Sequence, residues 1–530
     1  MNKLLERYHN FMQSKQSILL VLIPIVAAVY VHSPIVSYDF RYDDYAHFYD
    51  AANLRTLEYL LKPWGGHLQV VLNTFTCSFY MIFGFNAIYY FVLVLITHVI
   101  NVFLLFHIIK YLTQKEYLAV FGAALWGISP INQGSLGWYS AYAHVISATW
   151  IFWVLFDVVR IKYGALAFGK VVLIKWYLVL MLAAASYGTG LAIASLFAPV
   201  VWFLLADHEE RTKITIRLLP LVVVIPSLYL LSHWIYNMIS GVNEMPSFQA
   251  VNPSNWYDMV RFSYYMISYA VSTILLGPFI VYGEKSLIFT PFNTLSILQV
   301  LGLSCIIFII FTFIFLSIWL KSDGNKRSQM ISYIFVVVIT YGVIAMGRVP
   351  LIKEYGLPID KYSLTIRYYY IGPMFIAVVI CLMLEWVINQ KMIKERKCLL
   401  ILFVWIAIIL IPSKNVGMNM ESDHGQLSRG EYKREISKIQ DKILSYTEGA
   451  NVYIKNERLS SVTVLFNDGN VFPYLAALFM IEYPENNVFG RRVYFIEDDI
   501  SLANKLTKRH DTRVADLIVT PDLVPIGTDR

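Results

Sequence analysis

The sequence predicts a polytopic α-helical membrane protein, and three observations carry that prediction. Hydrophobic residues make up 57% of the 530 residues, charged residues make up only 15%, and the mean hydropathy is +0.56. Apolar runs long enough to cross a bilayer recur as far as Pro412. Lys and Arg gather in the segments between those runs. The net charge of +7 therefore reflects membrane topology, and no nucleic-acid partner is expected.

About eleven apolar runs are expected to cross the membrane, the first of them as an uncleaved anchor. They are 17–37, 86–109, 117–129, 138–158, 171–186, 191–206, 218–237, 295–320, 330–346, 368–389 and 399–412. Two further apolar segments, 67–83 and 262–282, are expected to re-enter or to lie flat on the outer side. That assignment places the basic clusters on the inner side, whereas two full crossings would raise the total to about thirteen.

With the amino terminus inside, three sizeable loops share the outer face, namely 38–66, 240–293 and 348–367. The first loop is acidic, and its residues 45–61 have the apolar spacing of an interfacial amphipathic helix. Residues 413–530 lack a spanning run and alternate helical with strand-like patterns. The sequence thus predicts a membrane domain, 1–412, and a small soluble α/β domain, 413–530, on the same outer side.

Two adjacent carboxylates, Asp43 and Asp44, follow the first span and precede Tyr45. Either carboxylate could cap the helix that follows, because Asp is a preferred N-cap residue. Neighbouring carboxylates also repel each other, which raises the pKa of one and suits it to accept a proton. Capping and catalysis can coexist, with one residue in each role.

Three residues are candidates for binding an anion: Lys62, His67 and Arg367. Lys62 and His67 bound a turn that contains Trp64, and their ordinary roles would be snorkelling and interfacial packing. Arg367 opens a late span at its outer end, where Arg is disfavoured, and its planar guanidinium can bind phosphate through two hydrogen bonds. Tyr368 follows it in a Tyr-rich stretch that is typical of an interfacial aromatic belt.

Two further candidates, His98 and Asn101, lie three residues apart on one helix face, where helix packing is the ordinary role. The sequence has no His/Cys cluster with zinc spacing, no phosphate loop and no Gly-x-Ser-x-Gly elbow. These motifs of soluble enzymes therefore do not apply, and the sequence indicates no cofactor.

Several short motifs occur in an order that resembles the opening of the GT-C membrane glycosyltransferases. They are Phe40-Arg41-Tyr42-Asp43-Asp44-Tyr45, Trp64-Gly65-Gly66-His67-Leu68, Phe83-Gly84-Phe85-Asn86 and Thr97-His98-Val99-Ile100-Asn101. Pro130-Ile131-Asn132-Gln133 and Arg367-Tyr368-Tyr369-Tyr370 are also similar to that group. Within the superfamily, the chain most resembles the protein O-mannosyltransferase and aminoarabinose-transferase branch. The similarity covers the chain as far as the 138–158 run, and the remainder by architecture only.

This resemblance implies a GT-C fold in a bacterial inner membrane and a polyprenyl-phosphate sugar as donor. It implies inverting transfer, without a metal, to a periplasmic glycolipid, cell-envelope glycan such as O-antigen, or protein. Asp43 matches the catalytic Asp of the family, and Asp44 stands where many members have Glu. Lys62 and Arg367 would stabilise the departing lipid phosphate, with His67 close by. The chain departs from the family at Asn132-Gln133, where relatives often carry an acidic residue.

Two other functions stay open at this point. A transporter or flippase of lipid-linked saccharides would place functional charges at mid-membrane and broken helices in two matching halves. An O-antigen ligase or polymerase would use a diphosphate-linked donor and usually carries a large periplasmic loop late in the chain.

Overall fold

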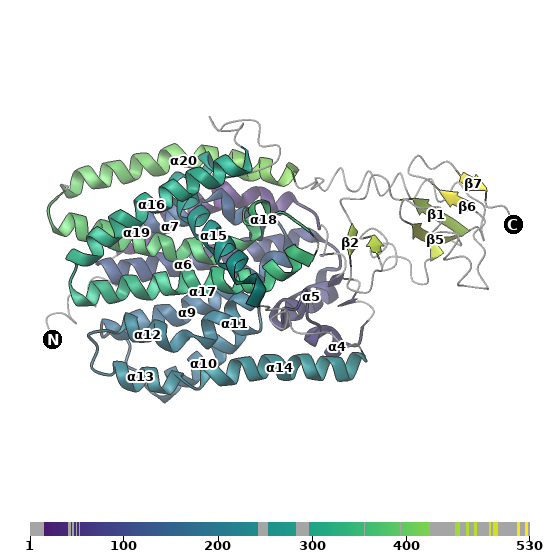
Figure 1. The fold of residues 1–530 in the computed structure, drawn as a ribbon, viewed down its shortest axis with the longest axis horizontal. Helices are drawn as coiled ribbons and strands as arrows, with labels where there is room; N and C mark the ends of the chain where they lie inside the picture. The colour runs from purple at the N-terminus through teal and green to yellow at the C-terminus, as the bar shows by residue number, and fades with distance from the viewer. Residues whose placement is uncertain are drawn as a thin grey trace.

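The computed structural model describes residues 15–40, 44, 47–48, 50–51, 54–241, 253–281, 296–354, 356–392 and 394–423, followed by seven short strands. Asp43 and Tyr45 lie outside the described residues, so the predictions made for them are not tested. The long helices run side by side along the long axis of the molecule, and α4, α5 and α18 lie toward the end nearer the strands (Figure 1).

Long apolar runs dictate most of these helices, because a backbone surrounded by lipid must satisfy its hydrogen bonds within the helix. The helices are α2 (Lys15–His32), α5 (Val70–Phe83), α6 (Ala87–Thr113), α7 (Glu116–Gly127), α9 (Tyr142–Lys162), α10 (Lys170–Ala184), α11 (Gly188–Ser195), α12 (Phe197–Leu204), α13 (Arg211–Leu218), α14 (Leu221–Ser240), α15 (Trp256–Leu276), α16 (Ile297–Lys321), α17 (Gly324–Glu354), α19 (Ile371–Asn389) and α20 (Glu395–Asp423). Short helical pieces connect them: η1 (Ser33–Ser37), α4 (Thr56–Leu61), η2 (Pro130–Asn132), α8 (Gln133–Leu136), η3 (Tyr139–Ala141), η5 (Pro253–Asn255), η6 (Gly277–Phe279), α18 (Ile359–Tyr362) and η7 (Ile366–Tyr368).

Nine helical stretches among the described residues are long and apolar enough to cross a membrane. They are Leu19–Ser37, Ala87–Thr113, Tyr139–Lys162, Arg211–Ser240, Trp256–Phe279, Ile297–Lys321, Gly324–Glu354, Ile371–Asn389 and Glu395–Val416. All but Trp256–Phe279 overlap a predicted span, which confirms the polytopic helical fold. The other predicted spans correspond to shorter helices, α7, α10 and the pair α11 and α12, so the total number of crossings stays a prediction.

The two apolar segments expected to re-enter or lie flat, 67–83 and 262–282, form helices of different length. Residues 67–83 contain α5, an apolar helix of 14 residues that is shorter than the candidate crossings. Residues 262–282 form most of α15 and η6, which together are long enough to cross. The first turn of α15 is held by the ion pair of Asp258 with Lys353 near the end of α17, at 2.9 Å. Its last turn leads to Gly277, which packs against Ile409 of α20.

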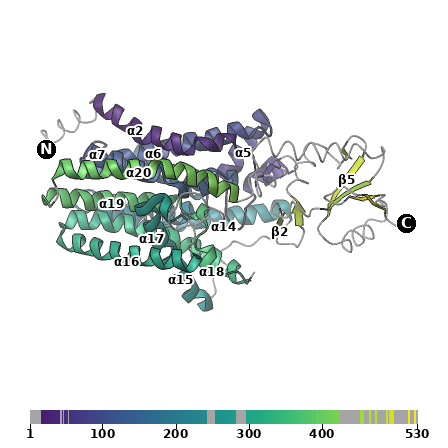
Figure 2. The same cartoon turned by 90° about the horizontal axis from the view of Figure 1, so that it is seen from above.

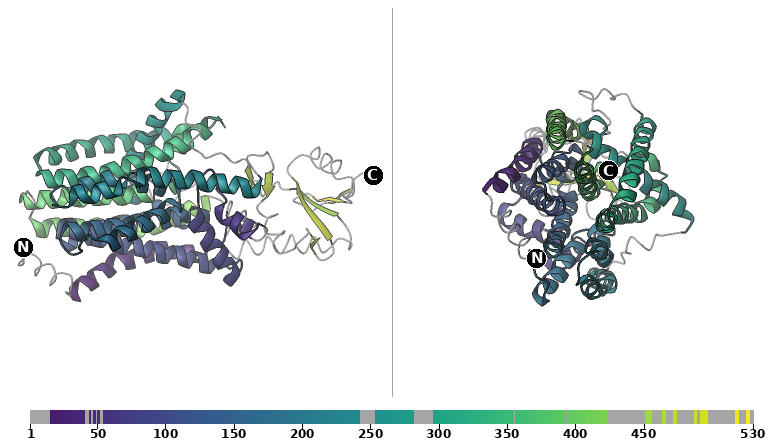
Figure 3. Two further views of the ribbon diagram at one scale, coloured as in Figure 1. Left: turned by 90° about the horizontal axis from the view of Figure 1, so that it is seen from below. Right: turned by 90° about the vertical axis from the view of Figure 1, so that its left-hand side faces the viewer.

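The interior of the bundle is formed by α9 and α19. Over an 18-residue apolar stretch of each of these spans 83% of the residues are buried, compared with 22% in α16 and α20, which lie at the periphery. Figure 2 shows α2, α20, α19 and α16 running alongside one another, and Figure 3 gives the view along the bundle. The candidate site is built from segments that adjoin the two interior helices.

The chain between α7 and α9 does not form a simple loop. Residues 128–141 fold into the short pieces η2, α8 and η3, and all of them except the half-buried Trp138 are buried. Irregular backbone within a membrane domain is stable only where protein surrounds it and satisfies its polar groups. Both the first outer loop, through Asp44, and the chain before α19, through Arg367, pack against this buried segment.

The predicted interfacial helix over 45–61 is found in part. Described residues between 44 and 51 are helical, and α4 covers Thr56–Leu61. Phe48 is fully buried and packs against Phe40, with ring centroids 4.4 Å apart, and against Tyr139, at 6.2 Å. The apolar side of this stretch therefore packs against the protein.

The strands beyond α20 form a separate sheet, in the order β4-β5-β1-β6-β7. Its strands are β4 (Asn487–Val488), β5 (Arg491–Ile496), β1 (Asn451–Lys455), β6 (Leu517–Val519) and β7 (Pro525–Gly527), and β2 (Thr463–Leu465) pairs with β3 (Val471–Pro473). β1 is parallel to β5 and β6, and the two edge strands are antiparallel. The helices predicted at 431–446, 474–481 and 500–508 lie outside the described residues. The domain boundary at 412 stays a prediction, and α20 continues past Pro412 to Asp423.

Candidate active site

A tight turn at Trp64–His67 organises the first outer loop. The amide of Trp64 donates to the carbonyl of His67 and the amide of His67 donates to that of Trp64, each at 2.9 Å. Gly65 and Gly66 have φ angles of +53° and +74°, the left-handed conformation that a two-residue turn of this kind requires and that glycine adopts without strain. The hydroxyl of Tyr229 in α14 donates to the carbonyl of Gly66, which fixes the turn against the bundle.

His67 lies in a group that we call the basic cluster: His67, Tyr187, Arg348, Arg367 and Tyr368. A terminal nitrogen of Arg348 lies 3.4 Å from His67 Nε2 and 3.4 Å from the Tyr187 hydroxyl. The guanidinium carbons of Arg348 and Arg367 lie 5.5 and 5.2 Å from the centre of the Tyr368 ring. A terminal nitrogen of Arg367 also donates to the Tyr368 hydroxyl, at 3.3 Å. The two arginines therefore meet around one buried tyrosine.

The electrostatics of the basic cluster favour an anion. Burial raises the pKa of Tyr368, but the charges of Arg348 and Arg367 outweigh it and bring the pKa below its ordinary value. Burial and, after it, the charge of Arg348 hold the pKa of His67 well below its ordinary value, so the imidazole is neutral. The Nε of Arg367 is buried and has no hydrogen-bond partner among the described residues. A potential that favours phenolate over phenol and disfavours imidazolium also favours a phosphate.

Arg367 is positioned by the buried segment 128–141. Its guanidinium lies over the ring of Trp138, 4.8 Å from the centroid. The hydroxyl of Ser135 donates to the carbonyl of Arg367 at 2.9 Å. A side chain at position 134 would come within 2.6 Å of the Arg367 amide nitrogen, so the close packing of α8 against η7 needs Gly134. These contacts hold the arginine within the bundle.

Asp44 is fully buried and reaches the same segment. Its Oδ1 accepts hydrogen bonds from the amide of Ser140, at 2.6 Å, and from the Ser140 hydroxyl, at 2.5 Å. Asp44 and Arg367 thus both contact the stretch Trp138–Ser140, which brings the acidic loop and the basic cluster to one place. The bonds to Ser140 anchor Asp44 to the buried segment, a role that differs from both the helix cap and the catalytic base predicted for the acid pair, and the catalytic role stays a prediction.

Lys62 and Trp64 lie in a second group of contacts, with Asp50 and His47. Lys62 Nζ forms an ion pair with Asp50 at 2.7 Å and lies 5.0 Å from the centre of the Trp64 ring. His47 stacks on Trp64, with ring centroids 3.9 Å apart. The sequence placed Lys62 at the phosphate with Arg367, whereas its described contacts are with Asp50 and Trp64. Its phosphate role stays a prediction.

His98 and Asn101 both contact Tyr370, which lies two residues after Tyr368 of the basic cluster. His98 Nδ1 lies 2.8 Å from the hydroxyl of Tyr370, to which the Asn101 amide also donates at 3.1 Å. His98 Nε2 lies 3.0 Å from the carbonyl of Gly127, and the indole of Trp126 donates to the carbonyl of Tyr370 at 3.2 Å. These bonds hold the residue that follows Tyr368 and Tyr369, so the packing role considered for His98 and Asn101 is the one that the contacts support.

Sequence reasoning missed Arg348 and His144 as members or neighbours of the site, whereas Tyr187 lies in a polar break, 186–190, that the sequence marks as a lesser candidate. Arg348 carried the same signal as Arg367, an Arg at the outer end of a predicted span. Tyr187 lies in the break between α10 and α11, and the ring of His144 stacks on it at 3.9 Å. Gly188 makes room for the cluster, because a side chain there would lie 2.8 Å from His67 Nδ1.

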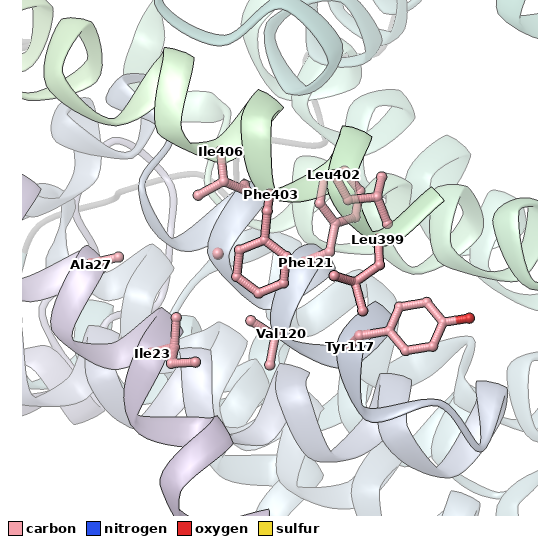
Figure 4. Close-up of a pocket in the computed structure, with 10 residues that line it drawn as sticks. Ile23, Ala27, Tyr117, Val120, Phe121, Leu399, Leu402, Phe403 and Ile406 are labelled. Carbon is pink, nitrogen blue, oxygen red and sulfur yellow. The ribbon is translucent and has the colours of Figure 1, made fainter. Parts of the chain in front are cut away.

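The other candidate sites among the described residues offer few polar or charged side chains. Within the described ranges, no group of three His, Cys, Asp or Glu side chains could hold a metal ion, and the expectation of no metal stays a prediction because Asp43 is not among them. A hollow between α2, α7 and α20 is lined by apolar side chains such as Val120 and Phe403, with Tyr117 at one side (Figure 4). A second cavity, between α15, α16 and α19, is also wholly apolar.

Fold and site together define a multi-pass membrane protein with a half-buried, positively charged site beside an acidic loop. No family model and no curated protein matches the chain. Among solved structures, the chain is similar to ArnT from Cupriavidus metallidurans bound to undecaprenyl phosphate, with 11% identity, 93% of this chain and 89% of that chain covered, and a TM-score of 0.43. The contacts of this chain itself support the proposal that follows.

Proposed function

We propose that the protein is an inverting glycosyltransferase of a bacterial inner membrane that moves a sugar from a polyprenyl-phosphate donor to an acceptor on the periplasmic side. The observation that carries this proposal is the meeting of Asp44 and Arg367 at Trp138–Ser140. It brings a loop with two carboxylates next to a pair of half-buried guanidinium groups, which are the two elements that the reaction needs.

In this proposal the basic cluster binds the phosphate of the donor. When the bond between the sugar and the phosphate breaks, the departing lipid phosphate gains negative charge, and groups that stabilise that charge accelerate the reaction. Arg348 and Arg367 supply two positive charges and several donors, including the Arg367 Nε that has no described partner. His67 adds a neutral donor beside Arg348. Two guanidinium groups make a metal unnecessary in this scheme.

The acidic loop supplies the base. Asp43 takes the proton from an acceptor hydroxyl, whose oxygen forms a bond to the anomeric carbon on the face opposite the phosphate. The bond from that carbon to the phosphate oxygen breaks, its electron pair leaves with the lipid phosphate, and the configuration inverts. Asp44 anchors the loop through Ser140 during this step. The strands that follow α20 would help to present the acceptor.

A flippase is the weaker alternative on these contacts. It would place functional charges at mid-membrane. Arg348 instead lies in the last two turns of α17, and Arg367 precedes α19.

Release of undecaprenyl phosphate from an undecaprenyl-phosphate sugar tests the proposal with the full chain in membrane vesicles. Asp43→Asn should abolish release while expression and thermal stability are unchanged, and Arg367→Ala should raise the KM for the donor. Arg327→Ala is the matched control, because Arg327 also lies over an indole, that of Trp319 at 5.6 Å, near the opposite end of α17. Wild-type turnover by Asp43→Asn would remove the assignment of the base.

A further inference from the structure

An apolar hollow lies between α2, α7 and α20, and the function proposed above assigns no task to it. Val120 and Ala124 of α7 are buried beneath it, whereas Ile23 of α2 and Phe403 of α20, which line it from two sides, are 41% and 45% exposed (Figure 4). The hollow therefore opens on the surface that faces lipid. Its lining is apolar except for the hydroxyl group of Tyr117.

The hollow is closed at the end nearer the candidate active site. There α2 and α20 meet, because the ammonium group of Lys414 lies 4.1 Å from the centre of the Tyr30 ring. α2 also meets the end of α7, where His32 Nε2 lies 3.1 Å from the carbonyl oxygen of Gly127. Toward the opposite ends of these helices the hollow separates α2 from α20. In the orientation proposed above, that open end is on the cytoplasmic side.

Basic side chains outnumber acids at the open end. Lys115, which precedes α7, pairs with Glu395 at the start of α20, at 3.5 Å, and its ammonium group lies 5.9 Å from the centre of the Tyr117 ring. Arg396 and Lys397 come next in α20 and are exposed, and neither forms an ion pair with another described residue. One acid thus faces three cations beside the open end of an apolar hollow.

This combination specifies an anionic lipid. An acyl chain suits the apolar lining, whereas a polar ligand would have to bury groups that find no partner there. A spanning helix of a partner protein would need a groove along the whole bundle, since such a helix is about 10 Å wide, and the contact of Lys414 with Tyr30 closes this one. The prenyl chain of the donor would start from the basic cluster, which lies toward the closed end. An acyl chain enters from the open end, where cations meet its headgroup.

We propose that the hollow holds one acyl chain of an anionic phospholipid, whose phosphate lies at Lys115 and Arg396. This proposal goes beyond the proposed function and does not depend on the reaction. The chain fills the space between α2 and α20 and so supports α2. The other end of α2 reaches the buried segment beside the candidate site, because His32 Nδ1 lies 2.9 Å from Gln133 Oε1.

Two adjacent cations of α20 provide the test of the headgroup. Arg396 precedes Leu399 by three residues and Phe403 by seven, so it lies on the helix face that lines the hollow. Lys397 is about 100° further around the helix, on the face of Leu400, which is 63% exposed and does not line the hollow. Arg396→Gln and its matched control Lys397→Gln therefore remove the same charge, one residue apart, on two different faces.

The seat of the chain is tested by filling the hollow. Ala27 of α2 lines it, and Ala27→Leu places a larger apolar side chain in the space of the acyl chain. Gly302→Leu in α16 is the control, because a side chain at Gly302 meets nothing within 4 Å and is remote from the hollow. If Ala27→Leu does not fold, the two exposed α20 variants still decide the proposal.

Native mass spectrometry of the purified full chain measures the retained lipid, with phosphatidylglycerol and phosphatidylethanolamine of identical acyl chains as probes. Lipid chains are as apolar as the helices, so the headgroup must supply the preference. We expect the wild type to retain phosphatidylglycerol over phosphatidylethanolamine. Arg396→Gln should weaken binding of phosphatidylglycerol about fivefold, the equivalent of about 1 kcal/mol for one cation, and Lys397→Gln less than about twofold. Ala27→Leu should lose the lipid, and Gly302→Leu should keep it.

Three results would overturn the proposal: equal retention of the two phospholipids by the wild type, equal effects of Arg396→Gln and Lys397→Gln, or unchanged retention in folded Ala27→Leu. Displacement of phosphatidylglycerol by undecaprenyl phosphate in the wild type would also overturn it, because the hollow would then hold the donor's chain. Failure of the wild type to release undecaprenyl phosphate from any donor would refute the proposed function and leave the phospholipid site standing.

Discussion

Arg348 provides the sharpest test of the basic cluster, because it was found only in the folded structure. Its guanidinium flanks Tyr368 at 5.5 Å and lies 3.4 Å from both His67 Nε2 and the Tyr187 hydroxyl. Arg348→Gln keeps a hydrogen-bonding side chain and removes the charge. A charge-assisted hydrogen bond to phosphate contributes about 2 kcal/mol, so kcat/KM for the donor should fall about 30-fold.

Donor titration of the purified variants measures this loss, with Arg327→Gln as the control at the other end of α17. The double variant Arg348→Gln/Arg367→Gln adds a sharper criterion. If both guanidinium groups contact one phosphate, the double variant should lose less than the sum of the single losses. An Arg348→Gln protein within about twofold of the wild type, or strictly additive losses, would show that Arg348 does not contact the donor phosphate.

Three further predictions concern the surroundings of the site. Gly188→Ala should displace His67, whose Nδ1 would lie 2.8 Å from the new methyl group, and raise the donor KM, whereas Gly169→Ala, which meets nothing within 4 Å, should not. His47 has a pKa of about 3 in the folded chain and its ordinary value of 6.5 in the unfolded chain, so lowering the pH protonates the unfolded state first and lowers the free energy of unfolding. Between pH 6.5 and pH 5, melting experiments should show that His47→Phe loses about 2 kcal/mol less of this free energy than the wild type. Ser140→Ala should lower both the melting temperature and kcat, because it removes the hydroxyl hydrogen bond to Asp44, which helps to anchor the acidic loop.

The helices could be predicted because their cause is local. A backbone in lipid must form its hydrogen bonds within its own segment, so each apolar run forms a helix almost regardless of its neighbours. Burial in the bundle could not be predicted in the same way. Ile371–Asn389 and Ile297–Lys321 are similarly hydrophobic, yet 83% of an 18-residue stretch of the first and 22% of such a stretch of the second is buried. Hydropathy does not distinguish contact with lipid from contact with other helices.

In the candidate site, too, some features could be predicted from sequence position and others depend on how the chain folds. Arg367 could be found from its sequence position, because an Arg at the outer end of a span needs a reason. The partners of Lys62 could not, since its ion pair with Asp50 depends on how the loop folds around the Trp64–His67 turn. Asp44 was found as half of an acid pair, but its anchoring to Ser140, 96 residues further along the chain, depends on the buried segment between α7 and α9.

The sequence by itself determined that this protein is a bundle of membrane helices with an acidic loop and a few cations at the ends of its spans, because apolar length and charge placement act segment by segment. Only the tertiary structure decided which charges meet. His67 and Arg348 lie 281 residues apart in the chain and come within 3.4 Å. Electrostatic interaction depends on distance in space and on burial, and both are set by how the helices pack.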